Sequence, residues 1–483
     1  NHIDAIIGLP ANIFFGTGIP TIIMVLRQKR ENTDVLIIDA SKGFIKEGKN
    51  NKLRASDIKR IADTFIKRES IPKFSRVVSR EEIRSNDYNL NIPRYVDSSE
   101  AAEHWDVYAS MFGGIPTAEI DEMSEFWTAF PALKKALFTE SGIPYVNVST
   151  PDIKSAIKSH PDVVGFENAF NAAFSTFPAF LKEELIDRMG SIEISKAETV
   201  LSADIFDRLK EIPLIDKYAA FQLLDDDWTG ISIDLEMLQT EGFAATKKVD
   251  PNLVIKKKDG KDQEVQEGWV GHIIPFDLVQ ATLLSTETDE LHGLESRLAE
   301  IPSEYESILD EMTEEDKESC NDVLTEEGDA FVPKEVSKKI KELKKDRSPE
   351  SVALRTLLEK VESLVKSEKE IKAEIKAKSA ALQAKTKDTI ESLSDEQALD
   401  LLEKKWIAPL IESIHKLPDT VIDSLVSQIQ ALQNKYATTF FEVEQQISET
   451  EATLSGMIDD LEGNEYDMLG LNELKKLLGG SAE

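Results

Sequence analysis

The sequence predicts an α/β fold at the N-terminus and a mainly α-helical chain after it, ending in long coiled-coil helices. Short apolar runs separated by turns with glycine and proline open the chain, a pattern typical of β-strands. From about residue 290 onward the composition shifts to Glu, Lys, Leu, Ser and Ala, and apolar residues recur at alternating spacings of three and four, as in coiled coils. A chain of 483 residues predicts roughly three domains of about 150 residues each. We place them at residues 1–97, 98–289 and 290–483.

The first two strands form a predicted hairpin. An apolar run at residues 4–10 ends on proline, and the turn at residues 12–20 holds two glycines and two adjacent aromatic residues. The next run, Thr21 to Leu26, has no polar alternation after its first residue, which is typical of a strand buried on both faces. Such a strand needs a sheet that is covered on both sides. We therefore expect further strands to precede Asn1 and the chain to be part of a larger protein.

The rest of the first segment predicts two more strands and two helices. A third apolar run, residues 35–39, predicts a short strand, and a lysine-rich loop follows it. Ser56 and Ser79 are suited to cap helices, the first with apolar residues at helical spacing after it and the second in a capping box. Residues 88–92 alternate strictly between apolar and polar, which predicts a half-buried strand that stops at Pro93.

The middle segment is predicted to be mixed but mostly helical. Most of the aromatic residues lie here, and two groups of apolar residues at helical spacing are expected to pack in a core. They are Phe126, Phe130, Leu133 and Leu137, and then Phe170, Phe174, Phe177 and Leu181. Apolar runs at residues 253–255 and 265–270, separated by a lysine-rich turn, predict a hairpin.

The last segment predicts two long helices. Residues 357–382 carry a heptad seam with charged interruptions at Glu368 and Lys378, and Pro409 is expected to interrupt the helix that Ser394 caps. Residues 419–461 keep the same spacing and predict one helix roughly 65 Å long, at about 1.5 Å per residue. Because one apolar stripe does not stabilise a helix alone in water, we expect the two long helices to pair with each other and with a partner.

Charge separates the first segment from the rest. Residues 1–97 hold 17 Lys and Arg against 12 Asp and Glu, a net charge of +5, whereas the remainder holds 40 basic and 78 acidic residues, a net charge of −38. Only the first segment is therefore suited to face nucleic acid. We expect the acidic remainder to bind protein, although solvation explains most of its charges equally well.

Several functional classes find no support in the sequence. The six histidines are scattered, and no residue pattern predicts a catalytic constellation or a metal site. The single cysteine, Cys320, excludes a disulfide framework and fits the reducing cytosol, so we expect a cytoplasmic protein. No apolar run approaches the roughly 20 residues of a membrane helix, so no membrane partner is expected.

Phe14 and Phe15 are the most distinctive candidates for a binding role. Two adjacent aromatic residues in a turn at the end of a sheet are able to stack on a nucleic-acid base. The alternative is that one of them packs beneath the turn.

Four stretches of the first segment closely resemble the modification subunit, or methylase, of type I restriction–modification systems. They are residues 7–20, whose turn reads Gly-Thr-Gly-Ile-Pro, and residues 36–41, 50–54 and 86–95. Residues 265–276 resemble a later segment of some longer members. The C-terminal helices agree with the family in kind rather than by motif.

The resemblance implies a fold and an activity. Members of the family transfer a methyl group from S-adenosylmethionine to N6 of adenine in double-stranded DNA. Their catalytic domain is a Rossmann-like, mostly parallel sheet with helices on both faces and a late antiparallel strand. Ile3–Leu9 and Thr21–Arg27 would be its last two strands. The target adenine has to leave the DNA helix to be methylated.

The resemblance also implies site residues and partners. It places Phe14 or Phe15 near the flipped adenine, and it places a turn and a basic rim near DNA. The turn residues are Gly16, Thr17 and Gly18, and the rim residues are Lys42, Lys49, Lys52 and Arg54. The C-terminal helices would dock a specificity subunit, with Val426, Tyr436 and Val443 in the seam. Two modification subunits and one specificity subunit make the methylase, and a nuclease–translocase (restriction) subunit joins them.

The sequence departs from the family in its catalytic motifs. The glycine-rich cofactor motif is absent, and no Asn-Pro-Pro tripeptide occurs anywhere in the chain. We therefore name no catalytic and no cofactor-binding residue, and we expect this chain to be inactive alone. The competing hypothesis is a non-enzymatic coiled-coil scaffold, which residues 290–483 fit equally well when taken alone. The coding sequence upstream of Asn1 would discriminate the two, since a methylase carries both motifs there.

Overall fold

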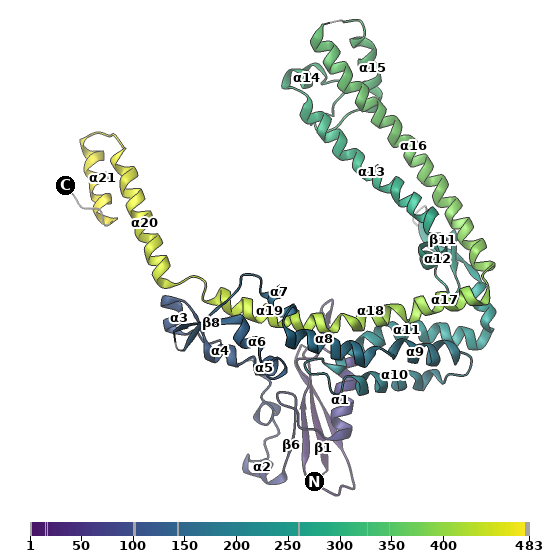
Figure 1. Cartoon of the computed structure of the whole chain (residues 1–483), viewed down its shortest axis with the longest axis vertical. Helices are drawn as coiled ribbons and strands as arrows, with labels where there is room; N and C mark the ends of the chain where they lie inside the picture. Colours follow the sequence, from purple (N-terminus) through teal and green to yellow (C-terminus); the bar gives the residue numbers. More distant parts are fainter. Residues whose placement is uncertain are drawn as a thin grey trace. The chain divides into compact units, whose positions relative to one another are not determined.

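The computed structural model describes residues 2–14, 16, 18–99, 103–142, 144–258, 261–325, 327–346 and 348–478 (Figure 1). Contacts divide the chain into two compact units. The first unit contains Asn1–Leu181, Glu193–Thr229 and Pro409–Glu483, and the second contains Lys182–Ile192 and Gly230–Ala408. Small sheets lie at the N-terminus and helices dominate the rest, which confirms the predicted fold class in outline. The predicted three-domain division stays a prediction.

A four-stranded sheet opens the first unit. Its strands, in spatial order, are β2 (Thr21–Leu26), β1 (Ile3–Leu9), β3 (Val35–Asp39) and β6 (Ser75–Val78). β1 and β3 are parallel, and the two outer pairs are antiparallel. The third predicted strand is thus confirmed, and all its residues are buried.

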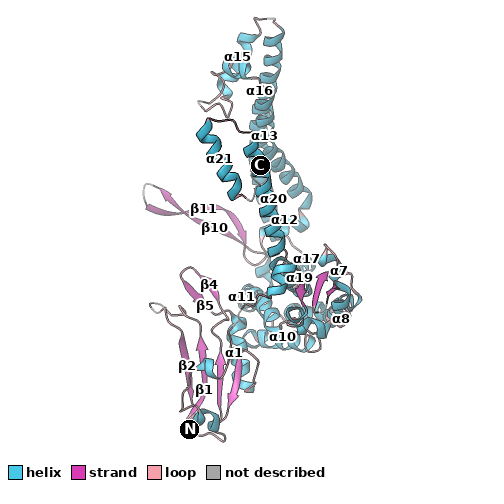
Figure 2. Ribbon diagram, turned by 90° about the vertical axis from the view of Figure 1, so that its left-hand side faces the viewer, coloured by secondary structure: helices cyan, strands magenta, loops and turns pink. Residues whose placement is uncertain are grey.

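Both faces of the β1–β3 pair are covered. On one face, Leu36 and Ile38 pack against Phe65 and Ile61 of α1 (Ala55–Lys67), which runs beside the sheet in Figures 1 and 2. On the other face, Ile37 belongs to a cluster with α2 (Arg80–Ser85) and the segment after it. Two layers therefore bury these strands, and their uninterrupted apolar sequences follow from that burial.

Two predictions about the strands are wrong. β2 is not buried on both faces: it is an edge strand, and Ile22 is 56% exposed. β1 and β2 are not the last two strands, because β3 and β6 extend the sheet beyond β1. The apolar sequence of β2 marks a surface that other protein atoms would have to cover, since the described residues leave it open.

The predicted strand at residues 88–92 is also wrong. Asp87 and Tyr88 adopt left-handed backbone conformations, and Ile92–Arg94 forms a 3₁₀ helix. The apolar side chains that suggested a strand pack on the sheet instead. Ile92 reaches over Gly8, where an added Cβ would lie 2.6 Å from Ile92 Cδ1. The alternation thus reports burial of Leu90 and Ile92 against β1 and β3, not strand pairing.

The helical part of the first unit surrounds an aromatic core. Seven of the eight predicted core residues are confirmed as buried, and Phe130, Phe170, Phe174 and Phe177 are fully buried. The eighth, Phe126, is half-buried and packs against this core. Its elements are α3 (Val107–Phe112), β7 (Ile115–Pro116), α4 (Thr117–Asp121), α5 (Ser124–Ala129), α6 (Leu133–Leu137), β8 (Phe138–Gly142), β9 (Tyr145–Val148), α7 (Ile153–Lys158), α8 (Pro161–Phe174), α9 (Phe177–Leu181) and α10 (Ile194–Arg208). C-terminal elements join it, namely α18 (Ala408–His415), α19 (Leu417–Lys435), α20 (Phe440–Asp459) and α21 (Glu465–Leu477). The helix α11 (Lys217–Glu241) continues from the first unit into the second.

The predicted single helix over residues 419–461 is wrong, because the chain breaks between α19 and α20. Thr439 accepts a hydrogen bond from the Glu442 backbone N–H and Glu442 accepts one from the Thr439 N–H, which starts a new helix. Before it, the buried Tyr436 hydroxyl donates to Glu119 at 2.5 Å and accepts from the Asp106 N–H at 3.1 Å. These contacts fix the chain at the break.

The second unit is a long helical hairpin with a β-ribbon at its base. The predicted hairpin is confirmed as β10 (Val249–Lys258) and β11 (Lys261–Gly271), with Val254 opposite Val265. Its helices are α12 (Phe276–Leu283), α13 (Ser285–Glu311), α14 (Glu314–Ser319), α15 (Pro333–Leu343), α16 (Pro349–Glu391) and α17 (Asp395–Trp406), with a π-helix at Lys182–Asp187 and a 3₁₀ helix at Phe243–Lys247. Figure 1 shows α16 running beside α13. Within the second unit, the heptad seam of α16 therefore pairs with α13 and α15, whereas the prediction paired it with the helix of residues 419–461.

Among the residues that are described, no helix combines the length and the apolar character that a membrane span requires.

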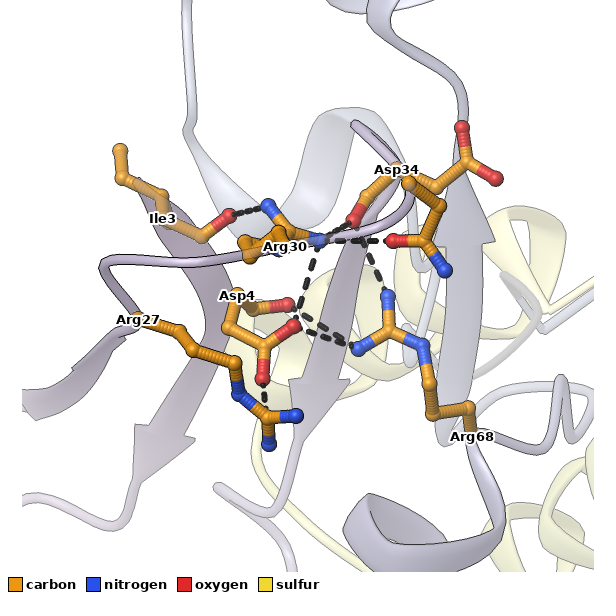
Figure 3. Close-up of polar contacts among 7 residues, drawn as sticks. Ile3, Asp4, Arg27, Arg30, Asp34 and Arg68 are labelled. Carbon is orange, nitrogen blue, oxygen red and sulfur yellow. Dashed lines mark hydrogen bonds and ion pairs between the residues drawn. The ribbon is translucent and has the colours of Figure 1, made fainter. Parts of the chain in front are cut away.

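A buried carboxylate holds the starting ends of the strands together (Figure 3). Asp4, at the start of β1, is only 3% exposed. Its carboxylate lies 3.1 Å from Arg27 Nη2, 3.2 Å from Arg30 Nη2 and 2.8 Å from Arg68 Nη1. Arg30 and Arg68 both also donate to the backbone oxygen of Asp34. One side chain thus connects β1, the β2–β3 loop and the end of α1.

Replacing Asp4 tests this role. We expect Asp4→Asn to lower the free energy of unfolding of the sheet by about 3 kcal/mol, because the buried Arg30 loses its counter-charge. Hydrogen exchange of the β1 and β3 amides measures the change locally. Asp34→Asn is the matched control, since it removes one charge but keeps the backbone oxygen that both arginines use. Equal losses in the two variants would contradict the prediction.

A histidine fastens the base of the β-ribbon in the second unit. His272 Nδ1 lies 2.6 Å from Asp250 Oδ2, and Nε2 lies 3.1 Å from Glu241 Oε1. Ionised Asp250 and Glu241 can accept hydrogen bonds but cannot donate them. Only the protonated imidazole of His272 has two N–H donors, so only this form satisfies both carboxylates. These hydrogen bonds, first that to Asp250, raise the pKa of His272 above its ordinary value. Lys248, 2.6 Å from Glu241, is the other charged group at this position.

The stability that His272 contributes should depend on pH. Because its pKa is raised in the folded chain, the contribution is complete below the unfolded pKa of about 6.5 and is lost as pH rises through the folded pKa. We therefore expect His272→Gln to weaken protection of the ribbon amides at low pH and to match the unchanged chain at high pH. Hydrogen exchange at several pH values measures this, and a difference independent of pH would exclude it.

Candidate nucleic-acid interface

The ends of the two parallel strands define one edge of the sheet. Because β1 and β3 run in the same direction, Leu9 and Asp39 end at the same edge, and the Ala40 N–H donates to Gly8 O at 2.9 Å. The turn after β1 carries the chain from this edge back into β2. It contains Asn12, with a left-handed φ of 56°, and Gly16, with φ of 81°.

A small hairpin is fastened to this turn. Its strands are β4 (Ile45–Glu47) and β5 (Asn50–Lys52). Asn51 donates its backbone N–H to Asn12 O at 2.9 Å and its side-chain amide to Ala11 O at 2.7 Å. The turn and the hairpin therefore form one surface, which we call the 10–54 edge.

The four predicted basic side chains of the 10–54 edge differ in their pairing. Lys52 lies 2.9 Å from Glu47, and Arg54 binds Asp57 through Nε at 3.0 Å. The hydrogen bond to Asp57 raises the pKa of Arg54. Lys42 and Lys49 are exposed and have no ion-pair partner in the described part of the chain. Of the four predicted cations, these two lysines are the most available to a phosphate.

A basic cavity of about 370 Å³ lies beside this edge. Four cationic and two acidic side chains line it, namely Lys42, Arg54, Arg60, Lys73, Asp39 and Asp57. The Arg60 guanidinium stacks on the Phe74 ring, 4.5 Å from its centroid. The excess of positive charge suits an anionic ligand such as a phosphate group.

The remaining predicted site residues lie in different surroundings. Phe14 is 55% exposed, whereas Phe15 and Thr17 lie outside the described residues. Val426 and Tyr436 are buried within the first unit, whereas Val443 on α20 is exposed. The roles of Asn51 as an anchor and of Arg60 and Lys73 as lining residues were not predicted from the sequence. For Arg60 and Lys73, the positive net charge of residues 1–97 was the only indication in the sequence. Nothing in the sequence indicated the contact of Asn51.

The comparisons with known proteins concern this same part of the chain. Residues 1–104 match the family model described as N-6 DNA Methylase. The first 104 residues are similar to the N-6 DNA methylase family. We refer to them below as the methylase segment.

The methylase segment is similar to subunits of type I restriction enzymes. The methylase subunit of MpnII from Mycoplasma pneumoniae is 38% identical over 108 residues, which cover 22% of this chain and 20% of that protein. The methylase subunit of MjaVII from Methanocaldococcus jannaschii is 40% identical over 111 residues, covering 22% and 19%. The resemblance inferred from the sequence is confirmed for this segment. The chain spans about a fifth of the length of these relatives.

One solved structure is similar over a comparable fraction of this chain. The methyltransferase subunit of a type I restriction–modification system from Streptococcus thermophilus is 52% identical, and the match covers 20% of this chain and 21% of that one, with a TM-score of 0.20.

The carboxylate at the end of β3 in the 10–54 edge is already hydrogen-bonded within the chain. A free carboxylate at a strand end is suited to hydrogen-bond a ribose hydroxyl. Asp39 is the carboxylate at the end of β3, but it accepts from the Ser41 N–H at 3.0 Å and the Ser98 hydroxyl at 2.5 Å. Within the described residues we therefore assign no contact to S-adenosylmethionine. No group of three or more His, Cys, Asp or Glu side chains in that part is placed to hold a metal ion.

The anchor at Asn51 yields a direct test. We expect Asn51→Ala to weaken the hairpin's attachment by about 1 kcal/mol, the value of one hydrogen bond, which corresponds to roughly fivefold faster exchange of the β4 and β5 amides. Asn50→Ala is the control, because Asn50 lies beside it in the same strand. The prediction fails if both variants exchange alike.

Proposed function

We propose that this chain is part of the modification subunit of a type I restriction–modification system, which methylates adenine N6 in double-stranded DNA. The observation that supports the proposal best is the coincidence of the family match with the basic part of the chain. The match covers residues 1–104, and the excess of positive charge lies within residues 1–97. Both include the whole 10–54 edge.

In this proposal the 10–54 edge faces DNA. Lys42 and Lys49 contact phosphates without reading sequence, as exposed lysines commonly do. Phe14, with Phe15 beside it, stacks on the adenine after that base has left the helix. The half-exposed position of Phe14 in the turn after β1 supports this role. S-adenosylmethionine supplies the methyl group when bound, and the residues that hold it belong to other strands of the complete subunit.

The partners are proposed from the same likeness. The complete subunit acts in the cytoplasm with a specificity subunit, a second modification subunit and a restriction subunit. The C-terminal helices dock the specificity subunit, and Val443 is the residue of the predicted set whose side chain is exposed. Without the cofactor and Asn-Pro-Pro motifs, this chain is inactive alone.

A non-enzymatic coiled-coil scaffold is the second candidate function. The exposed apolar residues of α20 and α21 fit it, and the family match does not extend to those helices. The scaffold hypothesis does not explain the sequence of the methylase segment. The methylase proposal therefore accounts for more of the chain.

Base flipping in the complete complex tests the proposed role of Phe14 and Phe15 in the turn of residues 12–20, which we call the aromatic turn. DNA with a fluorescent base analogue at the target adenine brightens when that base leaves the stack. Because stacking of one base contributes about 1–3 kcal/mol, we expect Phe14→Ala or Phe15→Ala to reduce flipping and methylation roughly 5- to 160-fold. Ile19→Ala is the control, since Ile19 is an exposed apolar residue of the same turn.

Two results would reject parts of the proposal. If both phenylalanine variants flip and methylate normally, the stacking role is wrong. If the complete complex with its specificity subunit transfers no methyl group to adenine N6, the proposed activity itself is wrong.

A further inference from the structure

The helix α20 carries a heptad seam that the described chain leaves uncovered. Six apolar residues recur at heptad positions along it and just beyond its end, and they are 38–62% exposed. They are Phe440, Val443, Ile447, Leu454, Met457 and Leu461. Residues 441–450 are all exposed, so this half of the helix has no covering layer among the described residues.

The neighbouring helix α21 packs beside the seam and not on it. Ser455 and Ile458 are the buried residues of α20, and neither is a seam position. Lys475 of α21 binds Asp459 at 2.7 Å and 2.8 Å, again outside the seam. The seam therefore remains open along its length, and a helix with one exposed apolar stripe is stabilised in water only when that stripe is covered.

The charges that α20 itself contributes all have one sign. The helix α20 contains five acidic residues, Glu442, Glu444, Glu449, Glu451 and Asp459, and no Lys, Arg or His. Glu444 and Glu451 follow the seam at heptad position e, where side chains face a partner helix in a coiled coil. Any helix that covers the seam has these carboxylates at its border.

We infer that the occupant of this seam is an amphipathic helix of another protein whose flanking positions carry Lys or Arg. Opposite charges at flanking positions favour pairing, and like charges oppose it. A second copy of this chain is disfavoured, because it would bring two helices together that carry only acidic charges. The inference depends on the proposed docking function and adds to it the chemistry of the docked partner.

Two labelled peptides test the inference on the full chain. Both are designed amphipathic helices with the same Leu and Ile seam, but one carries Lys and the other Glu at the flanking positions. We expect fluorescence anisotropy to show at least about tenfold tighter binding of the Lys peptide. Raising the salt concentration from about 0.05 M to about 0.5 M should reduce this preference, because it screens exposed charges.

Two sets of variants locate the site. Ile447→Asp combined with Leu454→Asp should abolish binding of the Lys peptide, whereas Ile66→Asp, at an exposed apolar position of α1, should leave it unchanged. Glu444→Lys combined with Glu451→Lys changes surface charges alone and should reverse the preference toward the Glu peptide.

Defined outcomes overturn the inference. Equal affinity for the two peptides would reject the charge requirement. Concentration-dependent self-association of the full chain that the Ile447→Asp, Leu454→Asp variant loses would identify a second copy as the occupant. Methylation by the complete complex is measured separately. Failure of the peptide test with intact methylation rejects this inference alone, and lost methylation with the expected peptide result rejects the proposed function alone.

Discussion

The carboxylate of Asp4 is the interaction on which the methylase segment depends. It lies at the starting end of β1, and its three arginine partners come from the end of β2, the β2–β3 loop and the end of α1. The strand that it fixes is also the strand whose far end carries the aromatic turn. The buried charge and the candidate DNA-facing edge thus lie at opposite ends of the same rigid, doubly covered strand pair. This arrangement positions the edge without placing any charge of the anchor near it.

Elements were predicted well from the sequence where their apolar pattern agrees with the burial of their side chains. Residues 35–39 form a buried strand, Ser79 and Ser394 cap helices, and the ribbon of residues 253–270 pairs as expected. Ser56 does not cap its helix, because α1 already begins at Ala55 with Arg54 as the capping residue. Prediction failed where an apolar pattern had another cause. Residues 88–92 alternate because Leu90 and Ile92 cover a sheet, and the apolar spacing of residues 419–461 continues through a break that Tyr436 and Thr439 fix by hydrogen bonds. Periodicity reports which side chains are apolar, but it does not report what they touch.

The candidate site divides in the same way. The aromatic turn and the basic loop could be predicted, because unusual residue types mark them in the sequence. The anchor that joins the turn to the loop could not be predicted. Asn51 binds the backbone oxygens of Ala11 and Asn12, which lie about 40 residues earlier in the sequence. Pairing of Lys52 and Arg54 with nearby carboxylates also reduces the number of available cations below what the sequence suggests. Local charge counts therefore overstate the positive potential of this edge.

The exposed edge strand β2 has a consequence for handling this chain by itself. Its outer backbone groups have no strand partner among the described residues, and its apolar side chains project from both faces. An edge of this kind, without proline, lysine or a bulge within Thr21–Leu26 on its outer side, is a template for pairing with any other extended chain. Strand-to-strand pairing between isolated molecules is therefore the expected route of aggregation, and covering β2 would remove it.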